Sequence, residues 1–328
     1  MGFFSFGLGT LCARSSWFIA RAGGISDLKL FYTDHFALPL PDGHRFPIEK
    51  YALLRQRIVG EGIAAADALV VPEPATDREL LRIHEKGYFE RVLRGELTDR
   101  ELRRIGLPWS LSLVERSRRS CGATIQACRE ALKDGVAVNL AGGTHHAFPD
   151  RGEGFCVFND CAVAARAMQV EGLAQRIVII DCDVHQGNAT AAIFKGNATI
   201  FTFSIHGGKN FPFHKEQSDL DIPLEDGTDD VSYLTALEPG LHSALEKSES
   251  DLAIYIAGAD PYSKDQYGRF RLSKAGLGER DAMVFQHCRD KGLPVAVAMG
   301  GGYAPGINDI VDIHLQTVRL AKKTSLRY

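Results

Sequence analysis

The residues at positions 177–185 read Ile-Val-Ile-Ile-Asp-Cys-Asp-Val-His and carry a strong signal for the fold class. The first four are all apolar and β-branched, which predicts a strand buried on both faces of a parallel sheet. This strand runs directly into Asp181, Asp183 and His185. Because open α/β sheets bind ligands beyond the carboxyl ends of their strands, the same stretch also predicts where a site lies.

Similar apolar runs recur along the chain and alternate with helical patterns. The predicted strands are 29–32, 136–140, 177–181, 199–203, 252–257 and 295–299. The predicted helices are 49–60, 77–93, 111–133, 160–171, 231–246, 274–291 and 307–321, with Asp160 and Ser273 as N-caps. This alternation predicts an α/β fold with a single domain at 28–328, in which helices cover both faces of an open, mostly parallel sheet.

Residues 1–27 are set apart from that domain. The first 26 residues contain no acidic side chain and only two basic ones, Arg14 and Arg21. This composition fits an organelle-targeting leader, and it fits a disordered or misassigned extension equally well. We therefore exclude this segment from the fold prediction.

Composition excludes several classes of function. The chain has 45% hydrophobic and 24% charged residues and a formal net charge of -3, which gives no electrostatic reason to expect nucleic-acid binding. A basic substrate could still be recognised locally. The seven cysteines form no Cys-x-x-Cys pair, so they indicate neither a zinc knuckle nor a disulfide framework, and a reducing, cytoplasmic location fits best. No apolar run reaches the roughly 20 residues of a membrane span.

Three residues at strand ends form a candidate metal site. Asp183 and His185 are two positions apart in an extended segment, so their side chains point to the same side. Asp260 follows another predicted strand, 252–257. Each aspartate alone is more often a helix or turn cap, but their joint placement favours metal binding. Two carboxylates and one imidazole suit a divalent ion and leave a position open for water.

Two further loops add candidate catalytic groups. His145 and His146 follow the strand 136–140, and an imidazole can act as a base near neutral pH. Asp181 is the expected partner of one ring, because a carboxylate fixes its tautomer. Tyr303 follows three glycines after the strand 295–299. It is either a residue packed beside a tight turn or a phenol that stabilises the oxygen becoming negative during amide hydrolysis.

Four segments together resemble the histone deacetylase family in order and spacing. They are 142–147 (Gly-Gly-Thr-His-His-Ala), 154–160 (Gly-Phe-Cys-Val-Phe-Asn-Asp), 181–188 (Asp-Cys-Asp-Val-His-Gln-Gly-Asn) and 300–303 (Gly-Gly-Gly-Tyr), with 257–261 (Ala-Gly-Ala-Asp-Pro) before the last. The resemblance extends from about residue 28 to near the C-terminus. The sequences at 150–152 and 185–188 are most similar to the class IV branch and its bacterial relatives.

This resemblance implies the open α/β fold that the family shares with arginases, and one catalytic Zn²⁺ held by Asp183, His185 and Asp260. It implies that His145 and His146 act as the histidine pair and that Tyr303 polarises the substrate carbonyl. Further implied residues are the substrate contacts Gly154, Phe155, Phe211 and Gly301, a K⁺ near the zinc at Asp181, Asp183, His185, Ser204 and Ile205, and a second cation at Phe194, Asn197, Ile200 and Ser218.

One position departs from the pattern of many family members. The partner of the second histidine is Asn188 here instead of an aspartate. Because asparagine is uncharged, it favours a neutral His146, which suits a general base.

The sequence therefore predicts a zinc-dependent hydrolase that removes acetyl or longer acyl groups from lysine side chains of proteins or from related amines. One alternative is a manganese ureohydrolase of the arginase type, although Gln186 and Asn188 stand where a second metal would need carboxylates. The other alternative is a non-catalytic protein that binds acyl-lysine.

Overall fold

The computed structural model describes residues 28–36 and 38–325, so the predicted leader at 1–27 lies outside the described residues. Eight strands form one sheet in the order β2-β1-β3-β8-β7-β4-β5-β6, and every neighbouring pair is parallel. The strands are β1 (Lys29–Phe31), β2 (Leu69–Val70), β3 (Val136–Asn139), β4 (Ile177–Asp181), β5 (Ile200–Gly207), β6 (Leu220–Leu224), β7 (Leu252–Ile256) and β8 (Val295–Ala298). The predicted open parallel sheet is confirmed.

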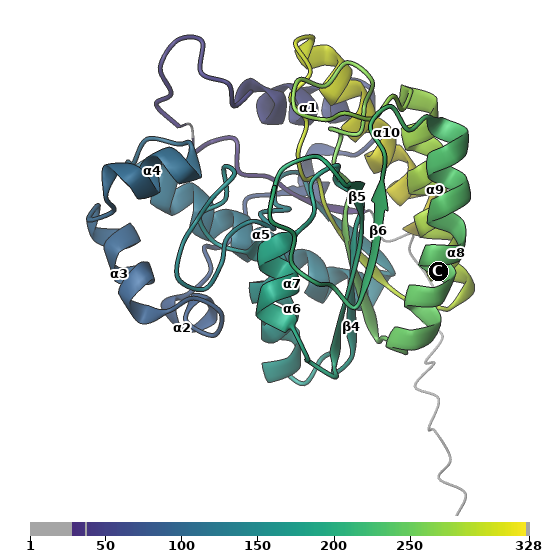
Figure 1. Cartoon of the computed structure of the whole chain (residues 1–328), viewed down its shortest axis with the longest axis horizontal. Coiled ribbons are helices and arrows are strands. Elements are labelled where there is room, and N and C mark those ends of the chain that lie inside the picture. Colours follow the sequence, from purple (N-terminus) through teal and green to yellow (C-terminus); the bar gives the residue numbers. More distant parts are fainter. Residues whose placement is uncertain (1–27, 37, 326–328) are drawn as a thin grey trace, which may run out of the picture.

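Helices cover the sheet on both faces (Figure 1). One layer holds α1 (Glu49–Gly60), α8 (Asp230–Ser248), α9 (Lys274–Asp290) and α10 (Ile307–Ser325). The opposite layer holds α5 (Leu111–Asp134), α6 (Asp160–Val170) and α7 (Asn188–Phe194), with α2 (Asp77–Leu80), α3 (Lys86–Arg94) and α4 (Asp99–Ile105) at its outer side. A short 3₁₀ turn, Ala66–Ala68, precedes β2.

The strands are apolar on both sides because they separate two hydrophobic cores. In β4, Val178 and Ile180 pack with α8, α9 and α10, whereas Ile177 and Ile179 pack on the side of α5 and α6. All four side chains are at most 1% exposed. Successive side chains of a strand point to opposite faces, so a continuous β-branched run is what a sheet covered on both sides requires.

Some sequence predictions were wrong in detail. The single helix expected at 77–93 is two helices, α2 and α3, separated by a turn that buries His84 and ties the Glu85 N–H to the Pro149 carbonyl. The N-cap of α6 is Asn159, whose side chain accepts the Ala162 N–H; Asp160 instead accepts N–H groups from the loop after β3. Ser273 caps α9 as expected. Strands β2 and β6 and helices α4 and α7 were not predicted.

The topology brings four loops to one edge of the sheet. Strands β3, β8, β7 and β4 are consecutive neighbours, and their carboxyl ends lead into the segments 140–146, 299–303, 257–260 and 181–185. Every candidate metal and catalytic residue lies in these loops or within a few residues of them. Among the described residues the six cysteines are buried and free, and none of the helices is both long and apolar enough to cross a membrane.

Candidate metal centre and catalytic site

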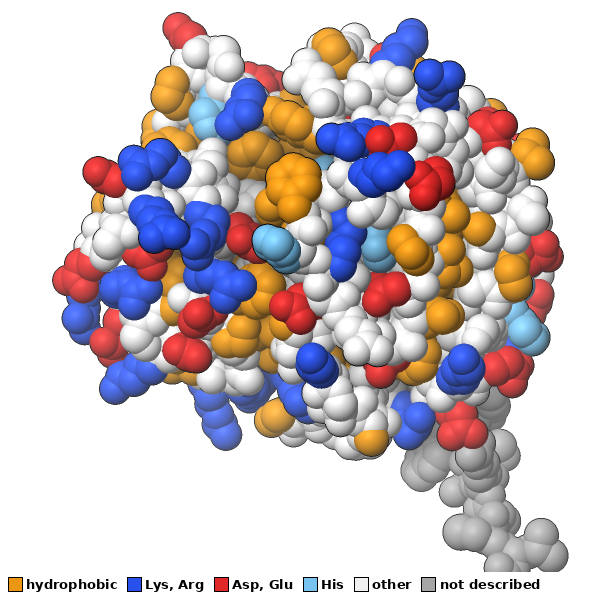
Figure 2. Space-filling model, viewed as in Figure 1, with side chains coloured by type: hydrophobic (Ala, Val, Ile, Leu, Met, Phe, Trp, Pro, Cys, Tyr) orange, Lys and Arg blue, Asp and Glu red, His pale blue; other side chains and the backbone are white. Residues whose placement is uncertain are grey.

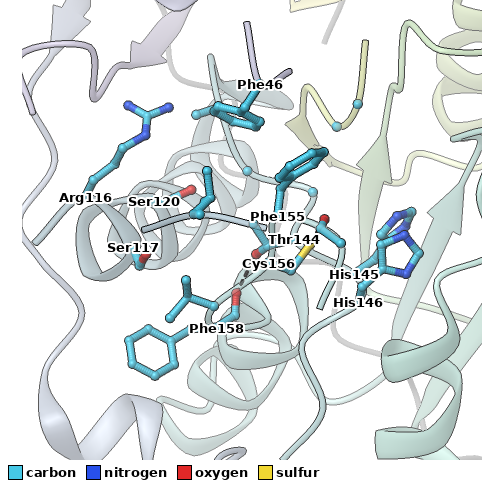
Figure 3. Close-up of a pocket in the computed structure, with 18 of the residues that line it drawn as sticks. Phe46, Arg116, Ser117, Ser120, Thr144, His145, His146, Phe155, Cys156 and Phe158 are labelled. Atoms are coloured by element: carbon cyan, nitrogen blue, oxygen red, sulfur yellow. Dashed lines mark hydrogen bonds between the residues drawn. The ribbon is translucent and has the colours of Figure 1, made fainter. Parts of the chain in front are cut away.

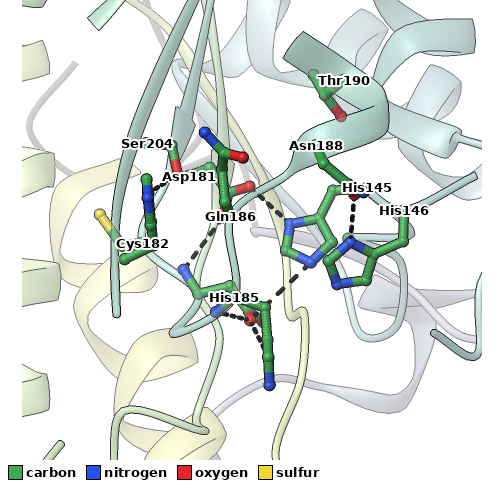
Figure 4. Close-up of polar contacts among 12 residues, drawn as sticks. His145, His146, Asp181, Cys182, His185, Gln186, Asn188, Thr190 and Ser204 are labelled. Atoms are coloured by element: carbon green, nitrogen blue, oxygen red, sulfur yellow. Dashed lines mark hydrogen bonds and ion pairs between the residues drawn. The ribbon is translucent and has the colours of Figure 1, made fainter. Parts of the chain in front are cut away.

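Asp183, His185 and Asp260 converge as the sequence predicts. One ligand atom from each lies within 4.8 Å of those of the other two, and this is the only such acidic or histidine group in the described chain. The His185 Nδ1 lies 3.0 Å from Asp183 Oδ1 and 3.1 Å from Asp260 Oδ2 (the polar contacts around His185 are drawn in Figure 4). The loops after two adjacent strands, β4 and β7, therefore supply one compact set of ligands.

This donor set fits a divalent cation. Two carboxylates are buried beside each other, with Asp183 1% and Asp260 0% exposed, and burial together with the charge of Asp183 raises the pKa of Asp260 to about 7. Burial alone would lower the pKa of His185, but its hydrogen bonds to Asp183 and Asp260 raise it to about 10. Without a bound metal, a proton on His185 Nδ1 supplies positive charge between the two carboxylates. A bound cation would supply positive charge at this same position.

Backbone N–H groups orient both carboxylates. The Val184 N–H donates to Asp260 Oδ1 at 2.9 Å, and the Gly301 N–H donates to Asp183 Oδ2 at 2.9 Å. A side chain at Gly301 would place its Cβ 2.0 Å from Asp260 Oδ2, so the loop after β8 can approach the ligands only as glycine. Such outer hydrogen bonds orient metal ligands.

His145 is paired with a carboxylate. Its Nδ1 lies 2.6 Å from Asp181 Oδ2, and both side chains are buried (Figure 4). Burial alone would lower the pKa of His145, but the charge and hydrogen bond of Asp181 raise it to about 9. The predicted partnership between Asp181 and this ring is therefore present.

His146 has a neutral partner. Its Nδ1 lies 2.7 Å from the Asn188 side-chain oxygen, and the Asn188 amide donates in turn to Glu153 Oε1 at 3.0 Å. Burial, together with the nearby His145 and His185 rings, holds the pKa of His146 well below its usual value. The two rings lie 4.1 Å apart between centroids, so one site holds a histidine that favours the charged form beside one that favours the neutral form.

Tyr303 lies beside the metal ligands on a loop held from two sides. The Tyr303 N–H donates to Asp265 Oδ2 at 2.6 Å, and the buried Lys50 ammonium donates to the Gly302 carbonyl at 3.3 Å. The Lys50 Nζ also lies 5.4 Å from the centre of the Tyr303 ring. Burial and the charges of Asp260 and Asp183 raise the pKa of Tyr303 well above its usual value, so the phenol keeps its proton and can donate it in a hydrogen bond.

Aromatic rings line the approach to these groups. Phe155 lies 5.6 Å from Tyr303 between ring centroids, and Phe211 lies 5.0 Å from His146. Both phenylalanines line an outer cavity of about 630 Å³ that reaches His146, His185 and Tyr303. A Cβ at Gly154 would lie 2.7 Å from the His146 ring, so this position must remain a glycine for the ring to sit there.

A second, narrower cavity of about 80 Å³ continues inward from the same groups (Figure 3). Arg116, Ser117 and Ser120 of α5 line its far side, and Phe46 and Phe155 lie near its outer part. The Arg116 guanidinium donates to the Thr33 carbonyl at 3.0 Å. This space has room for several water molecules or a short chain of atoms.

The family resemblance also implies a K⁺ site near the zinc and a second, more remote cation site. Asp181 and Ser204 are opposite each other in the β4–β5 pair, and Ile205 follows in β5. The more remote set includes Asn197, whose side-chain oxygen accepts the Thr199 and Ile200 N–H groups, and Ser218, which precedes β6.

Several residues around the site were not predicted. Glu153, Asp265 and Lys50 contact Asn188, the Tyr303 backbone and Gly302 respectively. No sequence signal marks Lys50, which is 252 positions from Gly302. Glu153 directly precedes the quoted segment 154–160, and Asp265 follows Asp260 by five positions, so proximity to a motif was the only hint.

Comparisons with known proteins identify the family of this chain. The model of the histone deacetylase domain matches residues 44–318. An uncharacterized protein of Picosynechococcus is 43% identical, covering 89% of this chain and 97% of that protein, and histone deacetylase 2 of Arabidopsis thaliana is 28% identical over 79% and 70%. A crystal structure of an HDAC homolog complexed with SAHA has a TM-score of 0.77 and 27% identity, covering 91% and 84%. The chain therefore belongs to the histone deacetylase family.

Proposed function

We propose that this chain is a zinc-dependent deacylase that hydrolyses the amide between an acyl group and a lysine side chain or a related amine. The observation that carries the proposal is the convergence of Asp183, His185 and Asp260 beside two histidines and a protonated tyrosine. Family membership supports a hydrolase activity, and the solved homolog that binds SAHA supports the choice of an acyl-lysine substrate.

The proposed role of each metal-binding or catalytic residue follows from the side chains that it contacts. Asp183, His185 and Asp260 would hold the zinc, which when bound supplies Lewis acidity for the carbonyl and lowers the pKa of water toward about 7. His146, neutral beside Asn188, would accept the proton of the attacking water. His145, which favours its charged form beside Asp181, or His146 after it has gained a proton, would protonate the departing amine.

Tyr303 and the aromatic side chains of the two cavities would bind the carbonyl oxygen, the amine stem and the acyl group of the substrate. The phenol keeps its proton, so it can donate a hydrogen bond to the carbonyl oxygen as that oxygen becomes negative. Phe155 and Phe211 would enclose the unbranched amine stem and exclude water from it. The inner cavity of about 80 Å³ would receive the acyl group.

Potassium is proposed as a structural ion near the zinc, with Asp181, Asp183, His185, Ser204 and Ile205 as its ligands. The support is that β4 and β5 pair here, which brings Asp181 and Ser204 to the same level of the sheet. A second cation at Phe194, Asn197, Ile200 and Ser218 rests on the family resemblance alone.

The manganese ureohydrolase is disfavoured by two side chains. Gln186 exchanges hydrogen bonds with the Glu216 backbone, and Asn188 contacts His146, so neither offers a carboxylate to a second metal. The non-catalytic alternative is disfavoured because each proposed catalytic position carries a side chain able to perform its step.

The experiment is hydrolysis of a panel of acyl-lysine peptides and acylated polyamines, measured with added zinc and with a chelator. We expect zinc-dependent release of the acid, and Tyr303→Phe should lower turnover about a hundredfold or more while zinc stoichiometry is unchanged. Tyr32→Phe is a matched control, since it removes the same hydroxyl from a ring that contacts Arg55 and lines neither cavity. Activity that survives complete zinc removal would contradict the proposal.

A further inference from the structure

The mouth of the outer cavity has an excess of positive charge that the proposed chemistry does not use. Apart from histidines, its charged lining residues are Arg45, Arg104, Arg269 and Glu153. The three arginines are exposed, whereas Glu153 is half-buried and accepts a hydrogen bond from Asn188 inside the site. Glu153 is thus bonded to a residue of the site, whereas the three arginines are exposed at the cavity mouth, where a ligand would enter.

The arginines come from three separate segments, each fixed against the walls of the site. The Arg104 carbonyl, at the end of α4, accepts the Gly154 N–H at 3.1 Å. Arg45 precedes Phe46, whose ring lies 5.2 Å from that of Phe155. Arg269 belongs to the loop in which Asp265 accepts the Gly268 N–H and also holds the Tyr303 backbone.

These guanidinium groups are largely free to bind a ligand. Among the described residues neither Arg45 nor Arg104 has an ion-pair partner. Arg269 has one, Asp226, at 3.4 Å, and both side chains are about half exposed, so this pair is weak. Figure 2 shows further Lys and Arg side chains gathered on the same face over α3 and α4, next to a hollow with hydrophobic side chains.

We propose that this arginine rim, defined as Arg45, Arg104 and Arg269, recognises carboxylates next to the acylated amine. The preferred substrates are then acyl-lysine segments with acidic neighbours, and not the lysine-rich tails that the family name suggests. Guanidinium groups bind carboxylates through paired hydrogen bonds, and like charges at a rim repel a basic partner. The inference rests on the proposed deacylase function and specifies its substrate class.

The carboxylate could come from acidic side chains in a peptide or from the free α-carboxylate of a single acylated lysine. Three peptides with one central acetyl-lysine and flanks of Asp, Ser or Lys test the first source. Free Nε-acetyl-lysine against its α-amide tests the second. We expect kcat/KM for the Asp-flanked peptide to exceed that for the Lys-flanked one about tenfold at low ionic strength, and the ratio to shrink with added salt.

Charge reversal locates the effect at the rim. Arg104→Glu should abolish or invert the ratio between Asp- and Lys-flanked peptides. Arg103→Glu is the matched control, because it makes the same charge change one position away on α4, is exposed and does not line the cavity. Its ratio should stay within about twofold of the wild-type value.

Different results would contradict the deacylase function and the role of the arginine rim. If no peptide is hydrolysed under any condition, the deacylase function itself is wrong. If peptides are hydrolysed, the Lys-flanked one is equal or better, and free Nε-acetyl-lysine is not preferred over its amide, the arginine rim is not a substrate-recognition site. The same holds if Arg104→Glu and Arg103→Glu change the ratio alike. A preference for free Nε-acetyl-lysine over its amide, without one among the peptides, would assign the rim to a single amino acid.

Discussion

Two clusters of charged groups are buried in this chain, and they differ in whether their charges are balanced. In the first, Arg280 and Asp281 of α9 form an ion pair at 2.8 Å, and Tyr255 and Thr317 each donate a hydrogen bond of 2.6 Å to Asp281. Both charged side chains are at most 1% exposed. The charges of this structural cluster are balanced within the protein.

The second cluster is the candidate metal centre, where Asp183 and Asp260 share one imidazole, that of His185. Two buried carboxylates facing one another are costly unless a cation lies between them. Burial of charge therefore does not by itself indicate function. A buried cluster with unbalanced charge of one sign is the feature that points to a missing ligand.

The two clusters are also connected. The Arg280 guanidinium donates to the Gly258 carbonyl at 2.6 Å and to the Cys182 carbonyl at 3.2 Å. These residues lie in the loops that carry Asp260 and Asp183. The balanced cluster thus supports the backbone of the unbalanced one, so the two should respond differently to equivalent substitutions.

The largest expected effect is on metal content. Asp183→Asn removes one anionic ligand, so we expect it to bind less than a tenth of the wild-type zinc and to show no measurable hydrolysis. The folded state without metal should be retained or even stabilised, because one of two facing carboxylates is gone. Elemental analysis and thermal unfolding together check this prediction. Full zinc content in Asp183→Asn would remove this residue from the ligand set.

The opposite pattern is expected for the balanced cluster. Asp281→Asn leaves Arg280 buried without a counter-charge, which should lower the free energy of unfolding by about 3–5 kcal/mol. Zinc stoichiometry at a temperature where the variant is folded should stay near one. Urea unfolding and elemental analysis on the same sample measure both, and unchanged stability would show that the two clusters do not differ as described.

A third buried group, His84, is satisfied only when neutral. Its Nε2 accepts the Asn159 N–H at 3.0 Å, so its Nδ1 carries the proton and donates to the Phe148 carbonyl at 3.0 Å. Burial lowers its pKa to about 4 from 6.5. The unfolded chain binds this proton more readily, so the stabilisation is complete above pH 6.5 and is lost as pH falls toward 4, by about 3 kcal/mol.

Unfolding free energies at pH 7 and pH 5 in wild type and His84→Gln test this. The variant has no titrating ring, so its stability should fall less between these pH values. An equal fall in both proteins would mean that other groups cause the acid sensitivity.

The smallest effect is expected at Lys50, which holds the Tyr303 loop without touching the metal ligands. Lys50→Met keeps the stem but removes the donor to the Gly302 carbonyl and the charge near the Tyr303 ring. We expect kcat to fall about tenfold with KM and zinc content nearly unchanged. Lys86→Met, an exposed change on α3, serves as the control. A loss confined to KM would contradict a role in positioning Tyr303.

The sequence predicted those parts of the fold and site that local patterns determine. Strands such as β4 are continuous β-branched runs, and Asp183, His185 and Asp260 follow two of them directly. Edge strands gave no such signal, because β2 has two residues and β6 is half-exposed and contains Pro223.

Features that depend on tertiary contacts could not be predicted. The break between α2 and α3 depends on the contact of Glu85 with Pro149, 64 positions away, and Lys50 reaches Gly302 only through the packing of α1 beside α10. Local propensity at 77–93 favours one helix, and tertiary structure overrides it.

The position of zinc in a crystal directly tests whether Asp183, His185 and Asp260 bind one metal ion. A crystal of the full chain soaked with one equivalent of zinc, with diffraction data collected at the zinc absorption edge, locates the ion by its anomalous scattering. We expect a single strong peak about 2.0–2.2 Å from an oxygen of Asp183, an oxygen of Asp260 and the Nδ1 of His185. A peak bound elsewhere, with these three side chains still bonded to one another, would contradict it.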